Sequence, residues 1–368
     1  MYVSRSLIKD DREEMEPRSK RRKESNYDPD SWVAYPVLSD EQSQDTELIK
    51  AFAVPIVNKK ETSRLVKELN SLYPLPRLQH IKRVRACKEK DSSHPLEVLV
   101  CLVSDAPGID FEKSITIDSL LPSDRVRHNG LGDPFLVNIP ACPPLTRPQF
   151  ELASKYWPTS FHEDKQVTVA LRGELFSSSQ KLRMQGYMMS ALAAAQAGKD
   201  RGMEAVGAVV VNPKTEGVVA VGHDCRSDHP LLHAVMVCID LVARGQGGGA
   251  FSPTLDKYPA CQSLFHSSSP KPDLEELQNI PISEDGGKPY ICNGYDLYIT
   301  REPCVMCAMA LVHSRIGRVF YGTASADGAF GTKYKIHTQK DLNHRFEVFK
   351  GVLRQQCIDL NEGPNINN

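Results

Sequence analysis

One histidine and two cysteines have the residue types and the spacing of a metal site. His233 is followed by Cys304 and, three residues further on, by Cys307, in the run Pro-Cys-Val-Met-Cys that begins at Pro303. One imidazole and two thiolates are three of the four ligands that a tetrahedral zinc ion takes. The sequence therefore predicts a Zn²⁺ site at His233, Cys304 and Cys307.

Two predicted helix starts position these ligands. Pro303 suits a first helical turn, where its missing N–H is no loss, so we expect a helix over 304–313 with both cysteines on one face. A second predicted helix, 230–243, carries His233. A helix N-terminus favours the thiolate form that zinc requires. An isolated cysteine pair is as often two buried thiols, and a lone histidine is more often a packing residue, so only the combination favours metal.

The surrounding pattern predicts a three-layer α/β/α domain with a central mixed sheet over 178–360. Strands and helices alternate there, as α/β domains require. The region between the two halves of the metal site, 245–287, contains Gly-Gly-Gly, Ser-Ser-Ser and several prolines. We expect it to be a disordered insertion. The predicted elements are a helix at 180–197, strands at 205–211 and 217–221, and strands at 295–300 and 318–322.

A smaller α+β domain is predicted over 46–145. Its strands are expected at 48–57, 78–88 and 96–103, with a helix at 59–72 and less regular segments at 111–121 and 135–139 completing it. One candidate arrangement is ferredoxin-like. A connector with a helix at 147–157 is expected over 146–177, and a short tail over 361–368.

Residues 1–45 are polar and charged, and we expect a disordered leader. The basic cluster Arg18–Lys23 within it is either a nuclear-import signal or part of a solvated tail. The chain has no apolar run long enough to cross a bilayer and no spacing typical of secreted disulfide frameworks among its ten cysteines. We therefore expect no membrane association and a location in nucleus and cytoplasm.

A net charge of −1 for 45 basic and 46 acidic residues conceals a local basic patch in the smaller domain. Such patches, rather than net charge, decide whether a protein meets phosphate. We predict that this patch contacts RNA backbone, with a solvated strand face as the alternative. Its residues are Lys82, Arg83, Arg85, Lys88 and Lys90.

The segment TREPCVMCAMALVHSRIGRVFYG (300–322), with EAVGAVVV (204–211) and HPLLHAV (229–235), resembles adenosine deaminases that act on transfer RNA, within the cytidine deaminase superfamily. The resemblance covers roughly 178–355. It implies that His233, Cys304 and Cys307 hold zinc, and it places Val235 where the family has the glutamate that moves protons. The sequence departs from bacterial members of the family in its C-terminal helix, which we expect to be truncated after Cys357.

Valine neither accepts nor donates a proton. Losing a general acid–base group removes a factor of about 10² to 10⁴ in rate, and one glutamate serves several proton transfers in this family. We therefore expect no catalytic residues and an inactive deaminase homologue.

The segment TRPQFELASKYWPTSFHED (146–164) is similar to the non-catalytic subunit of the eukaryotic heterodimers that make inosine at the wobble position of tRNA. This resemblance implies a zinc-binding subunit whose partners are a catalytic, glutamate-bearing deaminase subunit and tRNA. Two alternatives remain open. One is an active nucleoside or nucleic-acid deaminase that uses another acid, Glu204 or Asp224; the other is a stand-alone RNA-binding protein.

Overall fold

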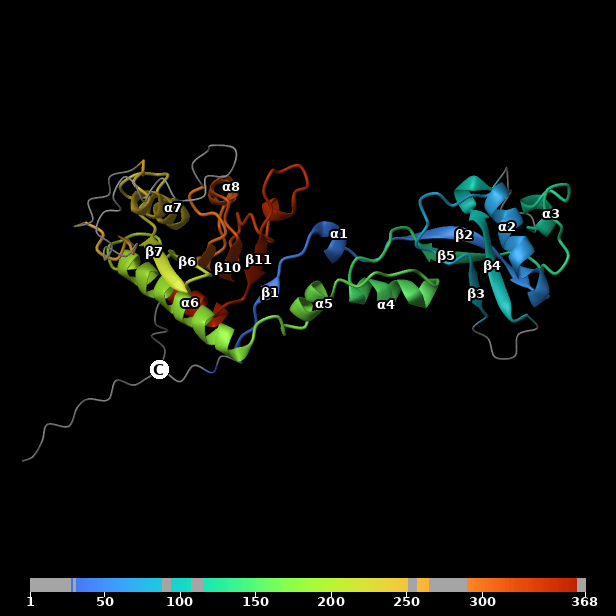
Figure 1. Ribbon diagram of the computed structural model, residues 1–368, viewed down its shortest axis with the longest axis horizontal. Helices are drawn as coiled ribbons and strands as arrows, with labels where there is room; N and C mark the ends of the chain where they lie inside the picture. The colour runs from blue at the N-terminus through green and yellow to red at the C-terminus, as the bar shows by residue number, and fades with distance from the viewer. Residues whose placement is uncertain are drawn as a thin grey trace, which may run out of the picture.

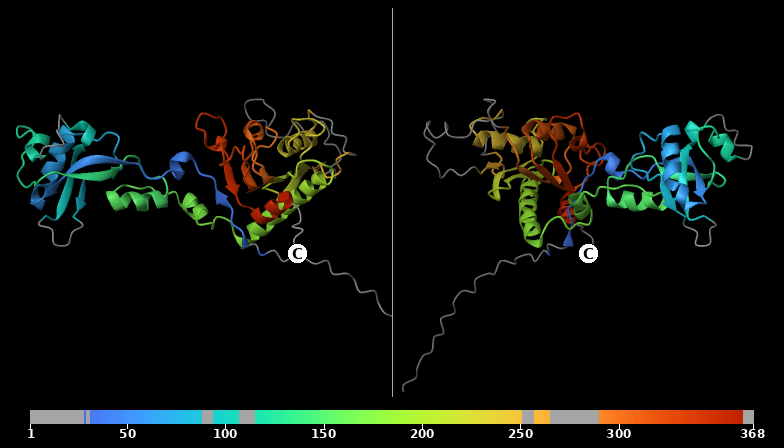
Figure 2. Two further views of the ribbon diagram at one scale, coloured as in Figure 1. Left: turned by 180° about the vertical axis from the view of Figure 1, so that it is seen from behind. Right: turned by 45° about the vertical axis from the view of Figure 1, so that its right-hand side comes forward.

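The chain folds into two lobes joined by two segments that run side by side (Figures 1 and 2). The computed structural model describes Asp28 and residues 31–87, 94–106, 115–250, 257–264 and 290–362. In this part of the chain, no helix combines the length and the apolar character needed to span a membrane.

The smaller lobe is built on a four-stranded antiparallel sheet with the strand order β3-β4-β2-β5. Its chain order is β-α-β-β-α-β, which agrees with the α+β, ferredoxin-like prediction. The 3-10 turns η2 (Lys59–Glu61) and η3 (Val103–Asp105) flank these elements. The elements are β2 (Leu48–Ile56), α2 (Thr62–Leu72), β3 (Val84–Ala86), β4 (Leu96–Leu102), α3 (Ile117–Leu120) and β5 (Phe135–Pro140).

Each face of this sheet is covered by a different part of the chain. Side chains alternate along β2 because successive residues of a strand point to opposite faces. Phe52 and Val54 pack with Leu65 of α2, whereas Ala53 packs with Trp157. Trp157 follows α4 (Arg147–Tyr156), so the connector helix ends inside the core of the smaller lobe.

The predicted strand 78–88 was wrong in extent. Within its described residues, 78–87, only Val84–Ala86 is a strand. The preceding backbone instead pairs with the connector: Ile81 bridges Thr159, and the Trp157 indole donates to the Lys82 carbonyl at 2.6 Å. Of the predicted 111–121 segment, residues 111–114 lie outside the described residues, and 117–120 form α3.

The larger lobe has a seven-stranded mixed sheet in the order β1-β11-β10-β9-β6-β7-β8. Helices α6 and α9 cover one face, and α7 and α8 cover the other. The predicted three-layer α/β/α domain is confirmed. Its helices are α6 (Ser178–Lys199), α7 (Ala234–Gly245), α8 (Val305–Ser314) and α9 (Arg354–Glu362); its strands are β1 (Tyr35–Pro36), β6 (Gly207–Asn212), β7 (Gly217–His223), β8 (Gln262–Ser263), β9 (Asp296–Arg301), β10 (Arg318–Thr323) and β11 (Glu347–Lys350).

The central strand β6 has no polar face because both of its faces are covered. Ala208 and Val210 point to the α7–α8 side, and Val209 points to the α6 side. Gly207 allows the helix to approach closely, since a Cβ there would lie 2.0 Å from the Ala191 carbonyl oxygen of α6.

The first described residues belong to the larger lobe, contrary to the prediction of a leader over 1–45. Trp32 and Ala34 are buried against α6, and β1 pairs antiparallel with β11. The smaller lobe is therefore inserted between β1 and α6. The chain leaves through α1 (Asp40–Ser43) and returns through α4 and α5 (Lys165–Leu171) (Figure 1). The basic cluster Arg18–Lys23 lies outside the described residues.

Two further boundaries need correction. Within the predicted disordered insertion 245–287, residues 257–264 are described: Tyr258 and Cys261 are buried, and β8 pairs with β7. A paired strand and a buried aromatic anchor this stretch. The final helix α9 continues through Glu362, five residues beyond Cys357, into the predicted tail.

A buried histidine next to the first strand should make the stability of the larger lobe depend on pH. His337, in the 3-10 turn η5 (Ile336–Thr338), contacts the Val37 carbonyl through Nε2 at 2.9 Å. Burial lowers the pKa of His337 from 6.5 to about 4. Because the folded protein favours the neutral ring, its contribution to stability is complete above the unfolded pKa and is lost as the pH falls toward 4.

We expect the unfolding free energy of the wild type, relative to His337→Gln, to decrease by at most about 3 kcal/mol between pH 7 and pH 4. Glutamine retains a donor but does not titrate. Denaturant unfolding at several pH values measures this difference, with the exposed His313→Gln as the control. If the difference in unfolding free energy between the wild type and His337→Gln did not change with pH, the prediction would be contradicted.

Candidate metal centre

The three predicted ligands stand at the N-termini of two helices on the same face of the sheet. His233 is the N-cap residue of α7, and Cys304 is the N-cap residue of α8, with Cys307 in the first turn. Each helix thus begins directly after a ligand, later than the predicted starts at 230 and 304. Residues 230–232 lie in a turn and extended chain instead.

The structure brings His233, Cys304 and Cys307 together. One potential ligand atom from each lies within 4.8 Å of the other two, and Cys304 Sγ is 3.7 Å from His233 Nδ1. Zinc bonds of about 2.0–2.3 Å in tetrahedral geometry separate sulfur and nitrogen ligands by roughly 3.6 Å. These side chains therefore fit a zinc ion.

The protonation of the two thiols favours the binding of a cation. A hydrogen bond with Cys307 lowers the pKa of Cys304 to about 5, while the same hydrogen bond and burial raise the pKa of Cys307. The pair thus shares one proton, and the helix N-terminus further favours the negative charge. A zinc ion would replace that proton.

The position two residues after His233 is aliphatic and buried. Val235 lies in the first turn of α7, 1% exposed, and packs in the core beneath the site. The cavity beside it, which all three ligands line, measures about 60 Å³. Ligand pockets are usually about 300–1,000 Å³, so this cavity has no room for a nucleobase.

Charged pairs lie among the residues that line the cavity. Arg301 contacts Glu204 at 3.0 Å, and Arg226 contacts Glu204 at 3.7 Å and Asp224 at 2.8 Å. Both acids that an alternative deaminase would need are therefore engaged by arginines.

Sequence reasoning missed a buried acid that shapes the wall of the cavity. Glu302 is 3% exposed and accepts backbone hydrogen bonds from Phe330 at 2.8 Å, Thr332 at 3.1 Å and Ser325 at 3.2 Å. A Cβ on Gly328 would meet this carboxylate, so the loop needs glycine there. A carboxylate directly before Pro303 was the available signal.

The comparisons with known proteins fit both lobes. Residues 182–323 match the profile of the cytidine and deoxycytidylate deaminase zinc-binding region, and residues 49–157 match that of the tRNA-specific adenosine deaminase TAD3 N-terminal domain. A Danio rerio protein named probable inactive tRNA-specific adenosine deaminase-like protein 3 is 63% identical over 94% of this chain and 99% of its own length. This chain belongs to the TAD3 family.

Further relatives extend the family. The Homo sapiens protein of the same name is 53% identical over 90% of this chain and 92% of its own. A Schizosaccharomyces pombe relative named tRNA-specific adenosine deaminase subunit tad3 is 28% identical over 79% of each chain. The prediction of an inactive deaminase homologue, drawn from Val235, is confirmed at the level of the TAD3 family.

The predicted RNA-contacting residues of this TAD3 chain divide into two groups. Lys82 is exposed, and Lys88 and Lys90 lie outside the described residues. Arg83, by contrast, donates to four backbone carbonyls, those of Leu69, Tyr73, Leu99 and Val100, and burial lowers its pKa to about 10.

Arg85 is also occupied within the fold. It pairs with the buried Glu97, donates to the Tyr156 carbonyl and lies 4.1 Å above the Trp157 ring. The prediction that Arg83 and Arg85 contact phosphate was therefore wrong, because their donors satisfy protein groups.

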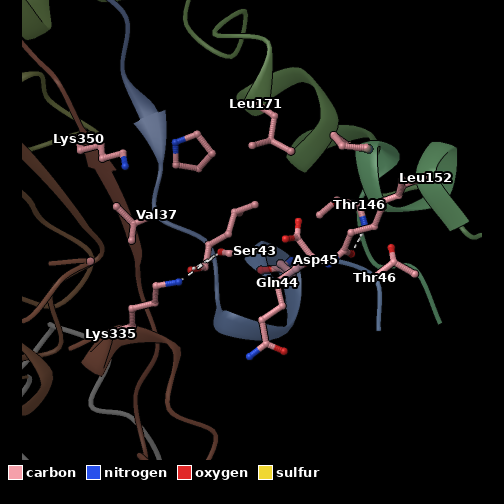
Figure 3. Close-up of a pocket in the computed structure, with 16 residues that line it drawn as sticks. Val37, Ser43, Gln44, Asp45, Thr46, Thr146, Leu152, Leu171, Lys335 and Lys350 are labelled. Atoms are coloured by element: carbon pink, nitrogen blue, oxygen red, sulfur yellow. Dashed lines mark hydrogen bonds between the residues drawn. The ribbon is translucent and has the colours of Figure 1, made fainter. Parts of the chain in front are cut away.

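A wider cavity, about 480 Å³, lies away from the ligands, between the connecting segments and the β1–β11 edge. Figure 3 shows Lys335 reaching Ser43 across it, and their atoms are 3.3 Å apart. Lys335 also pairs with Asp40 at 2.8 Å. These contacts attach α1 to the larger lobe.

We expect Glu302→Ala to lower the unfolding free energy by roughly 3 kcal/mol, because the buried N–H of Phe330 and the partly buried N–H groups of Ser325 and Thr332 lose their acceptor, at about 1–3 kcal/mol for each group left unsatisfied. Chemical denaturation measures the change. Asp341→Ala, which removes an exposed carboxylate, serves as the control and should have little effect. Equal stability of the two variants would contradict a structural role for Glu302.

Proposed function

We propose that this chain is the non-catalytic, zinc-binding subunit of a heterodimeric enzyme that converts adenosine to inosine at the wobble position of tRNA. The observation that carries the proposal is the buried Val235 beside three assembled metal ligands, in a cavity of about 60 Å³. A fold that retains its metal ligands without a proton shuttle or substrate space suits a scaffold better than an enzyme.

In this proposal, His233, Cys304 and Cys307 hold Zn²⁺. The ion has a structural role: it neutralises the thiolates and links the N-termini of α7 and α8. The protein's own residues maintain this arrangement, since Glu302 fixes the loop that walls the cavity. Val235 fills the space where a carboxylate would have to move protons.

The partner is a deaminase subunit that carries the missing glutamate. The names of the fungal TAD3 relatives, which describe them as subunits, support such an assembly. The smaller lobe contributes contacts to tRNA phosphates, with Lys82 as its exposed contribution from the predicted patch. Phosphate contacts of this kind are independent of sequence and depend on salt.

The ion pairs of Glu204 and Asp224 disfavour an independently active deaminase. A stand-alone RNA-binding protein would have no need of a deaminase scaffold. We further propose that the protein acts in both nucleus and cytoplasm.

We expect the purified chain to form no inosine in an anticodon stem-loop by itself, and to support deamination only when the glutamate-bearing subunit is added. Val235→Glu should remain inactive alone, because the closed cavity admits no base. Inosine is measured by sequencing or nucleoside mass spectrometry. Multiple turnovers by the isolated wild-type chain would overturn the proposal.

A matched pair of substitutions tests the RNA surface. Lys82→Ala in the heterodimer should weaken tRNA binding and reduce the slope of log K against log salt by about one, without changing stability. Arg83→Ala should instead lower the unfolding temperature, because four carbonyls lose their donor. An unchanged salt slope for Lys82→Ala would remove this residue from the RNA contact.

A further inference from the structure

A second cluster of one histidine and two cysteines lies in the larger lobe, apart from the three residues of the candidate metal centre. His223 is the last residue of β7, Cys225 follows two positions later, and Cys261 immediately precedes β8. One potential ligand atom from each lies within 4.8 Å of the other two. The distance from His223 Nδ1 to Cys225 Sγ is 3.7 Å, the same as between His233 Nδ1 and Cys304 Sγ.

All three side chains are removed from solvent. His223 and Cys261 are 0% exposed, and Cys225 is 2% exposed. The Tyr258 ring covers the imidazole edge-on, with centroids 5.6 Å apart. Cys261 also lies 3.5 Å from the His223 backbone nitrogen, so the segment before β8 is held directly against the end of β7.

The imidazole has a hydrogen-bonding defect that packing alone does not explain. His223 Nδ1 is 2.7 Å from the Asp224 carbonyl oxygen, which requires a proton on Nδ1. Nε2 is then a bare nitrogen, and it is buried without a hydrogen-bond partner among the described residues. Buried polar atoms are normally satisfied, so hydrogen bonds to the described residues leave this buried ring incompletely satisfied.

Two simpler explanations leave this histidine unexplained. Buried cysteines are ordinary packing residues, and Cys238 and Cys292 serve that role in the same core. A disulfide between Cys225 and Cys261 would use both sulfurs and give nothing to His223. A cation that accepts two thiolates and one imidazole uses all three groups.

We propose that His223, Cys225 and Cys261 form a second, structural site for a thiophilic divalent cation. The expected ion is Zn²⁺. The 3.7 Å separation matches the roughly 3.6 Å between nitrogen and sulfur ligands of tetrahedral zinc. If Nδ1 is the ligand, it exchanges its hydrogen bond with Asp224 for the metal. A single neutral hydrogen bond is weak compared with structural zinc binding.

This ion links residues 257–264 of the insertion to the end of β7 in the sheet. Cys261 is 38 residues from His223 along the chain, and β8 pairs with β7 through only two residue pairs. A cation at this point closes a long loop and holds the edge strand. It also fixes the backbone at Asp224, whose side chain holds Arg226 at the first cavity.

Metal counting on the intact chain tests the proposal. Native mass spectrometry of the full-length protein, purified with zinc and without chelator, should give two ions per wild-type chain. Cys261→Ser and His223→Asn should each retain one ion, and Cys304→Ser should also retain one. Cys238→Ala, which removes a buried thiol that is not a ligand, should retain two.

The outcomes separate this proposal from the proposed function. A single wild-type ion that Cys304→Ser removes, or a Cys225–Cys261 disulfide in a non-reducing peptide map, would overturn the second site. If the wild-type chain carries one ion, and this ion is lost in Cys261→Ser but kept in Cys304→Ser, the result would support the second site and contradict metal binding at the first. The wild-type count does not depend on the folding of any variant. Cysteine alkylation adds a second measurement: Cys225 and Cys261 should react only after chelation.

Discussion

The meeting of two helix N-termini is the constraint on which the larger lobe depends. Helices α7 and α8 begin at His233 and Cys304, and Cys307 follows within the first turn of α8. Their positive ends would repel one another without negative charge between them. Two thiols that share one proton provide part of that charge. The cavity beside Val235, which these ligands line, measures only about 60 Å³ and is too small for a nucleobase.

The grouping of His233, Cys304 and Cys307 could be predicted from residue type, the Cys-x-x-Cys spacing and two expected helix starts. The three layers could be predicted from alternating elements. The roles of Arg83 and Arg85 could not, because a run of basic residues does not reveal which donors will meet backbone carbonyls. The second cluster had no motif, since Cys225 and Cys261 come together only when β8 pairs with β7.

Glu302 illustrates a different limit of sequence reasoning. Its carboxylate acts as a hub for the loop that carries Ser325, Phe330 and Thr332, partners more than twenty positions away. The adjacent Pro303 is a local signal for this acid, but the sequence does not show which backbone groups the carboxylate will meet. The carboxylate thus organises the wall of the cavity beside Val235, and this role requires no proton transfer.

The pairing of Pro36 with Phe349 has a consequence for biosynthesis. Strand β1 can pair only after β11 has been synthesised, and β11 follows the inserted lobe and most of the larger lobe in the chain. The inserted lobe, whose strands are close in sequence, is complete long before then. Domains generally fold as units during synthesis, N-terminal first, and non-local pairing is slow. The smaller lobe can therefore fold while the larger lobe still lacks the partner of its first strand.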